Sequence, residues 1–221
     1  MIQQFSVGPI GENVYIAEKQ NQALAVFDPG ADAALLLPLI RQAFQRSQAP
    51  YVLLVCTHGH LDHTGALPEL LPALRSEKIP CKLCVHQADA AYFGEASVAT
   101  NEKLFASIRA TGFFNSFMVT IPEPDFYLTD GQILPDTDIL SLHTPGHTPG
   151  SCCFLLENGS TLISGDTLFN SGRGRTDGFD ADEDSILRSI RQKLCILPEN
   201  TRVLPGHGPE TSIRKEKHYY L

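Results

Sequence analysis

Residues 57–65 read Thr-His-Gly-His-Leu-Asp-His-Thr-Gly and place three histidines and one aspartate within six consecutive positions. Neutral imidazole and carboxylate are ligands that Zn²⁺ and Fe²⁺ accept from proteins. The apolar run just before them, residues 51–56 (YVLLVC), predicts a buried strand. The candidate ligands therefore lie where a strand ends and a loop begins, a usual place for chemistry in α/β proteins. This stretch predicts a metal site.

Length and composition indicate an ordinary globular chain. The sequence has 221 residues, 43% of them hydrophobic and 19% charged, which fits one domain, residues 1–221, with a substantial core. The net charge of −8 argues against a nucleic-acid backbone as the main partner. No apolar run reaches the roughly 18 residues of a membrane span, and the first residues do not read as a secretory signal. We therefore expect no membrane partner and a cytoplasmic location.

The six cysteines fall mostly within apolar segments, so we predict that they are reduced core residues: Cys56, Cys81, Cys84, Cys152, Cys153 and Cys195. Cys81-Lys-Leu-Cys84 has the spacing of a CxxC motif. No second pair follows it, and it lies within an apparent strand. We therefore predict no metal or redox role for this pair.

The spacing of apolar residues predicts short strands with helices between them. Strands are expected at residues 5–7, 14–17, 23–27, 51–56, 82–86, 139–143, 151–156, 161–164 and 202–204. Helices are expected at residues 31–47, from residue 64 or 65 onward, and at residues 183–194. Pro38 predicts that the first helix is kinked or starts later. A helical insertion is expected at about residues 88–130, and the whole pattern favours an α/β (α+β) fold of two sheets covered by helices.

Three further candidate ligands each follow a predicted strand. His147 lies in His-Thr-Pro-Gly-His-Thr-Pro-Gly after strand 139–143, and Asp166 lies in Ser-Gly-Asp-Thr-Leu-Phe after strand 161–164. His207 lies in Pro-Gly-His-Gly-Pro after strand 202–204. Glycines flank each ligand and allow the backbone to approach closely. Together with the cluster at 58–63, these residues make seven candidate ligands, which suit two metal ions sharing a carboxylate better than one tetrahedral zinc.

The ordered set THGHLDH, HTPGHTPGS, SGDTLF and PGHGP resembles the metallo-β-lactamase-fold hydrolases, and specifically their glyoxalase II-like branch. Asp28-Pro-Gly and Gly174-Arg-Thr-Asp177 extend the resemblance over nearly the whole chain. It implies a four-layer αββα sandwich with two divalent metal ions, Zn²⁺ foremost and Fe²⁺ or Mn²⁺ as alternatives. It also implies that His58, His60 and His147 bind one ion, that Asp62, His63 and His207 bind the other, and that Asp166 bridges them.

The same resemblance implies metal-assisted hydrolysis of a thioester such as S-lactoylglutathione, with Asp62 as a catalytic residue. Full-length glyoxalase II proteins carry a C-terminal helical domain that supplies cationic residues for glutathione, and residues after His207 offer no counterpart. Recognition is then expected from the core, from residues 94–130, or from a partner subunit in a homo-oligomer. Arg173 and Arg175 are the candidate substrate-binding residues. A purely structural pairing of Arg175 with Asp177 is the favoured alternative for that arginine.

Other functions on the same fold remain open. A persulfide dioxygenase with one Fe²⁺ would use His58, His147 and Asp166 as a facial triad. Pro205-Gly-His-Gly-Pro209 favours the hydrolases, because the dioxygenases typically carry an acidic residue and an aromatic there. A nuclease, a lactonase, a β-lactamase and an inactive binding module are less favoured. His86 and His143 lie outside the motifs, and we predict that they are structural.

Overall fold

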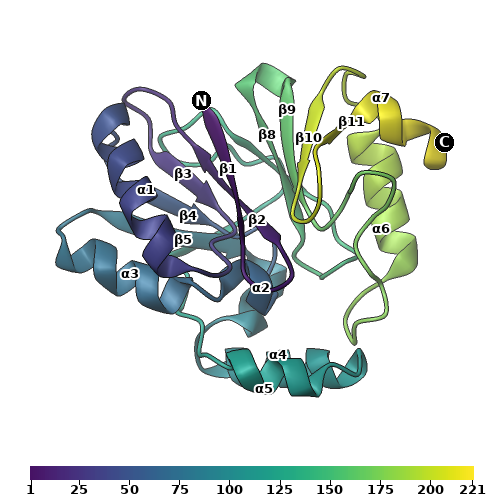
Figure 1. Cartoon of the computed structure of the whole chain (residues 1–221). Coiled ribbons are helices and arrows are strands. Elements are labelled where there is room, and N and C mark those ends of the chain that lie inside the picture. Colours follow the sequence, from purple (N-terminus) through teal and green to yellow (C-terminus); the bar gives the residue numbers. More distant parts are fainter.

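The computed structural model describes residues 1–221, except for the side chains at positions 113 and 114. Two sheets form its centre (Figure 1). The first has the order β1-β2-β3-β4-β5-β6, with strands Ile2–Val7, Glu12–Ala17, Leu24–Phe27, Val52–Val55, Cys81–His86 and Phe126–Leu128. The second has the order β11-β10-β9-β8-β7, with strands Thr211–Ser212, Arg202–Pro205, Thr161–Gly165, Cys152–Leu156 and Leu140–His143. Strands β3 to β6 run parallel, as do β9 and β10.

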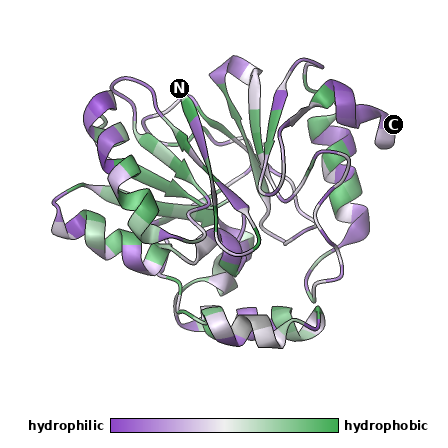
Figure 2. Cartoon of the chain, viewed as in Figure 1, coloured by the Kyte–Doolittle hydropathy of each residue, from purple (hydrophilic) through white to green (hydrophobic). Residues whose placement is uncertain are grey.

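Three separate hydrophobic cores lie between four layers. Alternate residues of a strand face opposite sides of a sheet, so β4 sends Val52 and Leu54 to one core and Leu53 and Val55 to another. The first core packs the outer face of the first sheet against α1 (Ala33–Ser47) and α3 (Leu67–Ser76). The second lies between the sheets, and the third packs the second sheet against α6 (Glu183–Ser189). The predicted αββα sandwich is confirmed, and Figure 2 shows apolar residues concentrated on its inner strands.

Two helix predictions need correction. The helix after the metal motif was expected to begin at residue 64 or 65, but the short helix α2 (Leu61–Thr64) begins inside the motif and α3 follows it. Polar ligands interrupt the apolar spacing there, so periodicity does not reveal this turn. Helix α1 runs from Ala33 through Pro38 to Ser47, so it does not start later. Burial of one face of the helix offsets the backbone hydrogen bond that a proline removes.

The segment between the two strand-rich halves is mainly helical up to residue 117. It contains the 3₁₀ turns η1 (Gln87–Tyr92) and η2 (Gly94–Ala96), then α4 (Ser97–Ser107) and α5 (Thr111–Phe117). Strand β6 lies inside the range that was expected to be inserted and pairs with β5 in the first sheet. In Figure 1, α4 and α5 lie across the end of the sandwich at which α2 is found.

The remaining elements are short. Strand β11 and helix α7 (Ile213–Glu216) were not expected, and the last five residues of the predicted helix 183–194 form a π-helical turn, η4 (Ile190–Leu194). All six cysteines are free thiols, as predicted. Cys81 and Cys84 are three positions apart in β5, so they point to opposite faces of the sheet. Among the described residues, no helix is long and apolar enough to cross a membrane.

Candidate metal centre

The seven predicted ligands meet at one edge of the sandwich, because each follows the end of a strand. His58 and His60 lie in the loop after β4, and Asp62 and His63 lie in α2. The other three come from the second sheet, in the loops after β7, β9 and β10: His147, Asp166 and His207. Segments about 150 residues apart in the sequence are thereby brought together.

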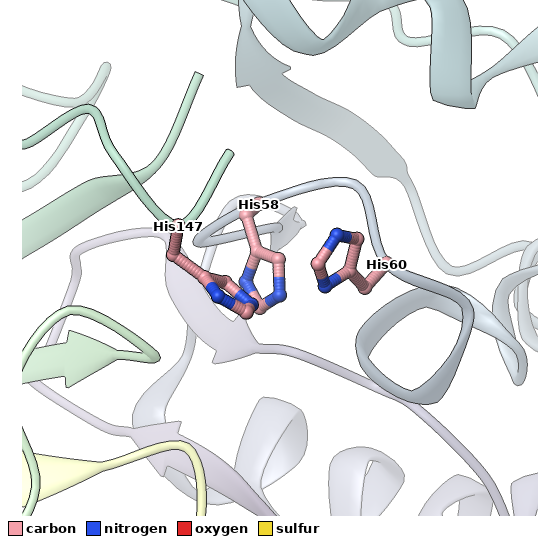
Figure 3. A group of neighbouring side chains, drawn as sticks. All are labelled: His58, His60 and His147. Atoms are coloured by element: carbon pink, nitrogen blue, oxygen red, sulfur yellow. The ribbon is translucent and has the colours of Figure 1, made fainter. Parts of the chain in front are cut away.

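The side chains form two groups with a carboxylate between them. Potential ligand atoms of His58, His60 and His147 lie within 4.8 Å of one another, and Figure 3 shows the three rings converging. Asp62, His63 and His207 form a second group within the same limit. Asp166 reaches both, since its carboxylate oxygens lie 3.5 Å from His147 Nε2 and 3.4 Å from His63 Nε2. These are the groups that the family resemblance implied.

Unsatisfied buried atoms point into this space. The Nε2 atoms of four histidines and Oδ1 of Asp166 are buried with no hydrogen-bond partner among the described residues: His58, His60, His63 and His147. A buried polar atom without a partner costs about 1–3 kcal/mol, so five of them in one place need a common partner. Burial holds the pKa of His58 and His60 well below its ordinary value, which keeps both imidazoles neutral. Divalent metal ions fit this donor set.

Hydrogen bonds at the opposite ring nitrogens aim the histidines. His58 Nδ1 lies 3.0 Å from Thr57 Oγ1, and His147 Nδ1 lies 2.8 Å from the backbone oxygen of Arg175. His63 Nδ1 lies 3.0 Å from Asp28 Oδ2. Such partners fix the orientation of an imidazole and leave Nε2 free as a ligand.

A cavity of about 380 Å³ opens beside the ligands. Five of the seven line it: His60, Asp62, His147, Asp166 and His207. The other lining residues are Ile10, Leu104, Phe105, Ile108, Ala110, Arg175 and Gly178. The cavity therefore joins the ligand cluster to helix α4 and the loop that follows it.

Comparison with known proteins agrees with this geometry. Residues 7–207 match the family described as "Metallo-beta-lactamase superfamily". The chain belongs to this superfamily. It is 34% identical over 213 residues to "Probable metallo-hydrolase YqgX" of Bacillus subtilis (strain 168), covering 96% of this chain and 92% of that protein. It is also 32% identical over 206 residues to "Hydroxyacylglutathione hydrolase GloC" of Haemophilus influenzae, covering 87% and 84%.

Two solved structures of the superfamily resemble the whole chain. The BLEG-1 B3 metallo-β-lactamase has a TM-score of 0.80 at 31% identity, covering 100% of this chain and 98% of that one. TTHA1623, solved in a di-iron-bound form, has a TM-score of 0.75 at 31% identity, covering 98% and 99%. These likenesses support the superfamily fold over the whole chain.

Asp28 holds the loop after β4, which carries His58 and His60. Its carboxylate accepts hydrogen bonds from Thr57 N at 2.6 Å and Thr57 Oγ1 at 2.7 Å, and it also contacts His63. In the sequence, Asp28 stood out only as part of the Asp28-Pro-Gly segment that extends the family resemblance. The available signal was an acidic residue directly after the apolar strand 23–27.

Asp89 joins the two loops that carry the first ligand group, and sequence analysis missed it. The carboxylate is fully buried and accepts hydrogen bonds from Gly59 N at 2.9 Å, Thr148 Oγ1 at 2.8 Å and Gly150 N at 2.6 Å. Burial raises the pKa of Asp89 to about 7, although these hydrogen bonds act in the opposite direction. No feature of the sequence near residue 89 indicates this contact.

Glu12 is a second buried acid that sequence analysis missed. It is 2% exposed, and neither carboxylate oxygen has a hydrogen-bond partner among the described residues. Oε1 lies 3.9 Å from His63 Nδ1, and residue 12 bridges to His207 through the backbone. Burial raises the pKa of Glu12 well above its ordinary value.

The two candidate substrate arginines differ in position. Arg175 lines the cavity, and its side chain forms two hydrogen bonds with Asp177, at 2.6 and 2.7 Å. The structural pairing considered as an alternative is therefore present. Arg173 pairs with Glu183 and is not among the residues that line the cavity. Substrate binding by either arginine stays a prediction.

His86 and His143 form a stacked pair that connects the edge regions of the two sheets. Their ring centroids lie 3.8 Å apart, with an angle of 10° between the planes. His143 Nε2 lies 2.8 Å from the backbone oxygen of Pro149, and Lys193 Nζ donates to the backbone oxygen of His143. Neither histidine belongs to the ligand groups found among the described residues.

This pair predicts a pH dependence of stability. Burial, and then His143, lower the pKa of His86 from 6.5 to about 4, although Asp130 opposes the shift. The unfolded chain therefore binds more protons than the folded one between pH 6.5 and 4, and the free energy of unfolding falls as the pH falls through this window. Because the side chain is partly exposed, we expect a contribution of about 1 kcal/mol. Denaturant unfolding from pH 7 to 4 should show a shallower decline for His86→Gln than for the unmodified protein. His218→Gln, at an exposed histidine, is the control, and parallel curves for all three proteins would contradict the prediction.

Proposed function

We propose that this chain is a metal-dependent thioester hydrolase of the hydroxyacylglutathione hydrolase type, acting on thioesters such as S-lactoylglutathione. The observation that carries the proposal is the position of Asp166 between two three-residue ligand groups beside a cavity. The relationship to GloC of Haemophilus influenzae, whose name states this activity, supports it.

We assign the two ligand groups to two divalent ions, with Asp166 as the shared ligand. The four buried Nε2 atoms without partners lie in both groups, which supports two ions over one. Zn²⁺ is the first choice for imidazole and carboxylate ligands, and Fe²⁺ and Mn²⁺ accept the same set. The di-iron-bound form of TTHA1623 supports iron as the alternative.

Two ions bound here would supply a hydroxide nucleophile at neutral pH and polarise a substrate carbonyl. Asp62 lines the cavity, and its Oδ2 lies 3.1 Å from His207 Nε2 and 3.4 Å from His63 Nε2. The imidazoles hold the pKa of the Asp62 carboxyl well below its ordinary value, although burial alone would raise it. We assign this carboxylate to orienting the nucleophile.

The lining of the cavity favours a thioester over an amide. Apart from the proposed ligands, Arg175 is the one ionisable side chain among the described lining residues, and arginine does not give up its proton in proteins. The site therefore offers no separate general acid for a leaving amine. A thiol has a pKa of about 8.5, so a thiolate leaves without protonation.

The alternative is a persulfide dioxygenase with one Fe²⁺ held by His58, His147 and Asp166. That arrangement would leave the buried Nε2 atoms of His60 and His63 without a partner. We therefore keep it as the second candidate. We also propose a small-molecule partner and a cytoplasmic location, which six free thiols support.

The direct test is hydrolysis of S-lactoylglutathione by metal-loaded protein. Asp62→Asn and His147→Ala should each lower kcat/KM by about 100-fold or more, since loss of groups that merely support ligands already costs about 10- to 100-fold. Metal content is measured on the same samples.

Matched controls exchange the same residue types at exposed positions, as Asp184→Asn and His218→Ala, and should leave the rate unchanged. Absence of thioester hydrolysis by protein that holds its metal would overturn the proposal. Oxygen uptake with glutathione persulfide would then support the dioxygenase.

A further inference from the structure

One wall of the cavity beside the ligands is apolar. Leu104 and Phe105 of α4, Ile108 just after it, and Ala110 line this wall, and Ile10 from the turn between β1 and β2 adds to the lining. Leu104 and Phe105 are 4% and 8% exposed and also belong to the first hydrophobic core, so the core holds the wall in place. The ligand residues line the same cavity.

Outside the ligand groups, the lining of the cavity has little to offer a charged substrate. Arg175 is the one cationic side chain among its described lining residues outside the ligand groups, and its Nε and Nη2 already donate to Asp177. Glutathione carries two carboxylates and would find one arginine that is already paired. In this part of the cavity, away from the ligand groups, burial of apolar surface is therefore the larger favourable interaction.

From this lining we infer that the site selects thioesters that carry an apolar chain or ring, which packs against the wall formed by Leu104, Phe105 and Ile108. The inference rests on the proposed function and names the substrate class within it. The apolar group can belong to the acyl part or to the thiol part, because either can extend from a carbonyl placed beside the ligands. The cavity of about 380 Å³ has the size of typical small-molecule sites.

Two series of substrates show whether the apolar group belongs to the acyl part or to the thiol part. In the first, acyl groups from acetyl to hexanoyl are joined to one small neutral thiol. In the second, acetyl is joined to alkyl thiols of increasing length. Each buried methylene contributes about 0.8 kcal/mol, so kcat/KM should rise about fourfold per methylene in one series until the wall is covered.

Ile108→Asn tests the wall itself. The residue is half-buried, and its replacement should flatten the dependence of kcat/KM on chain length. Val98→Asn is the matched control, because Val98 is also half-buried against the first core and does not line the cavity. The control should keep the full dependence on chain length.

A binding experiment gives a readout that does not depend on turnover. Alkyl thioethers, which cannot be hydrolysed, are titrated into metal-loaded protein by calorimetry. Affinity should rise about fourfold per methylene, with a negative heat-capacity change, and Ile108→Asn should flatten this trend. If thioesters are hydrolysed but neither rate nor affinity depends on chain length, the inference is overturned and the proposed function stands. If no thioester is hydrolysed, the proposed function fails, and the thioether affinities still decide whether the wall binds apolar groups.

Discussion

Gly30→Ala is expected to lower the free energy of unfolding by about 4 kcal/mol or more and to empty the metal centre. A Cβ atom at position 30 would overlap the backbone oxygen of Asp62 and would lie 2.8 Å from Glu12 Oε2. The obstacle is backbone, so no change of rotamer relieves it. The neighbouring Pro29 and Asp28 already bond to Ala66 and Thr57, so this segment cannot move away without breaking those contacts.

Gly112→Ala is the matched control. It lies in helix α5, and outside its chain neighbours and its own helix backbone no heavy atom of the described residues lies within 4 Å of an added Cβ, so the change should be within about 1 kcal/mol and in the stabilising direction. Denaturant unfolding and metal content are measured for both variants. Equal midpoints for Gly30→Ala and Gly112→Ala would show that the backbones of residues 28–30 and 61–66 are not locked together as described.

Asp89→Ala is expected to lower the free energy of unfolding by about 3–5 kcal/mol. The change removes the shared acceptor of Gly59 N, Gly150 N and Thr148 Oγ1, which are buried or nearly so. Gly59 lies between His58 and His60, and Thr148 follows His147. The loops that carry these three ligands therefore lose the hydrogen bonds that hold them together. We expect the metal affinity of this ligand group to fall about 10- to 100-fold, as for other groups that orient ligands.

Asp89→Asn should give an intermediate result. Its single amide oxygen can keep the bonds from Gly59 and Thr148, but the amide nitrogen then faces the N–H of Gly150. Asp184→Ala, at an exposed aspartate, should leave both stability and metal binding unchanged. The visible spectrum of cobalt-loaded protein reports the ligand geometry directly. An unaltered spectrum in Asp89→Ala at equal metal content would reduce Asp89 to a purely structural residue.

Much of the fold was predictable, because burial leaves a local trace in the sequence. The run at 51–56 is apolar throughout since β4 is covered on both faces, and the long, Leu- and Ala-rich spacing at 31–47 matches α1. Short elements left no such trace. Strands β6 and β11 have three and two residues, and α2 consists largely of polar residues held by contacts from elsewhere in the chain.

By itself, the sequence determined which residues can serve as metal ligands, because donor chemistry belongs to the side chain and the strand-end positions follow from local patterns. His58, His60, Asp62, His63, His147, Asp166 and His207 were predicted in this way, and the structure brings their side chains together. Only the tertiary structure decided how they are supported. Asp28 and Asp89 accept hydrogen bonds from residues 29 and 61 positions away in the sequence, and Glu12 is buried beside His63. The structure also pairs Arg175 with Asp177 and places Leu104 and Ile108 in the lining of the cavity beside the ligands. These contacts depend on which surfaces come together when the sheets pack. A local pattern of residues does not reveal contacts between residues that are far apart in the sequence.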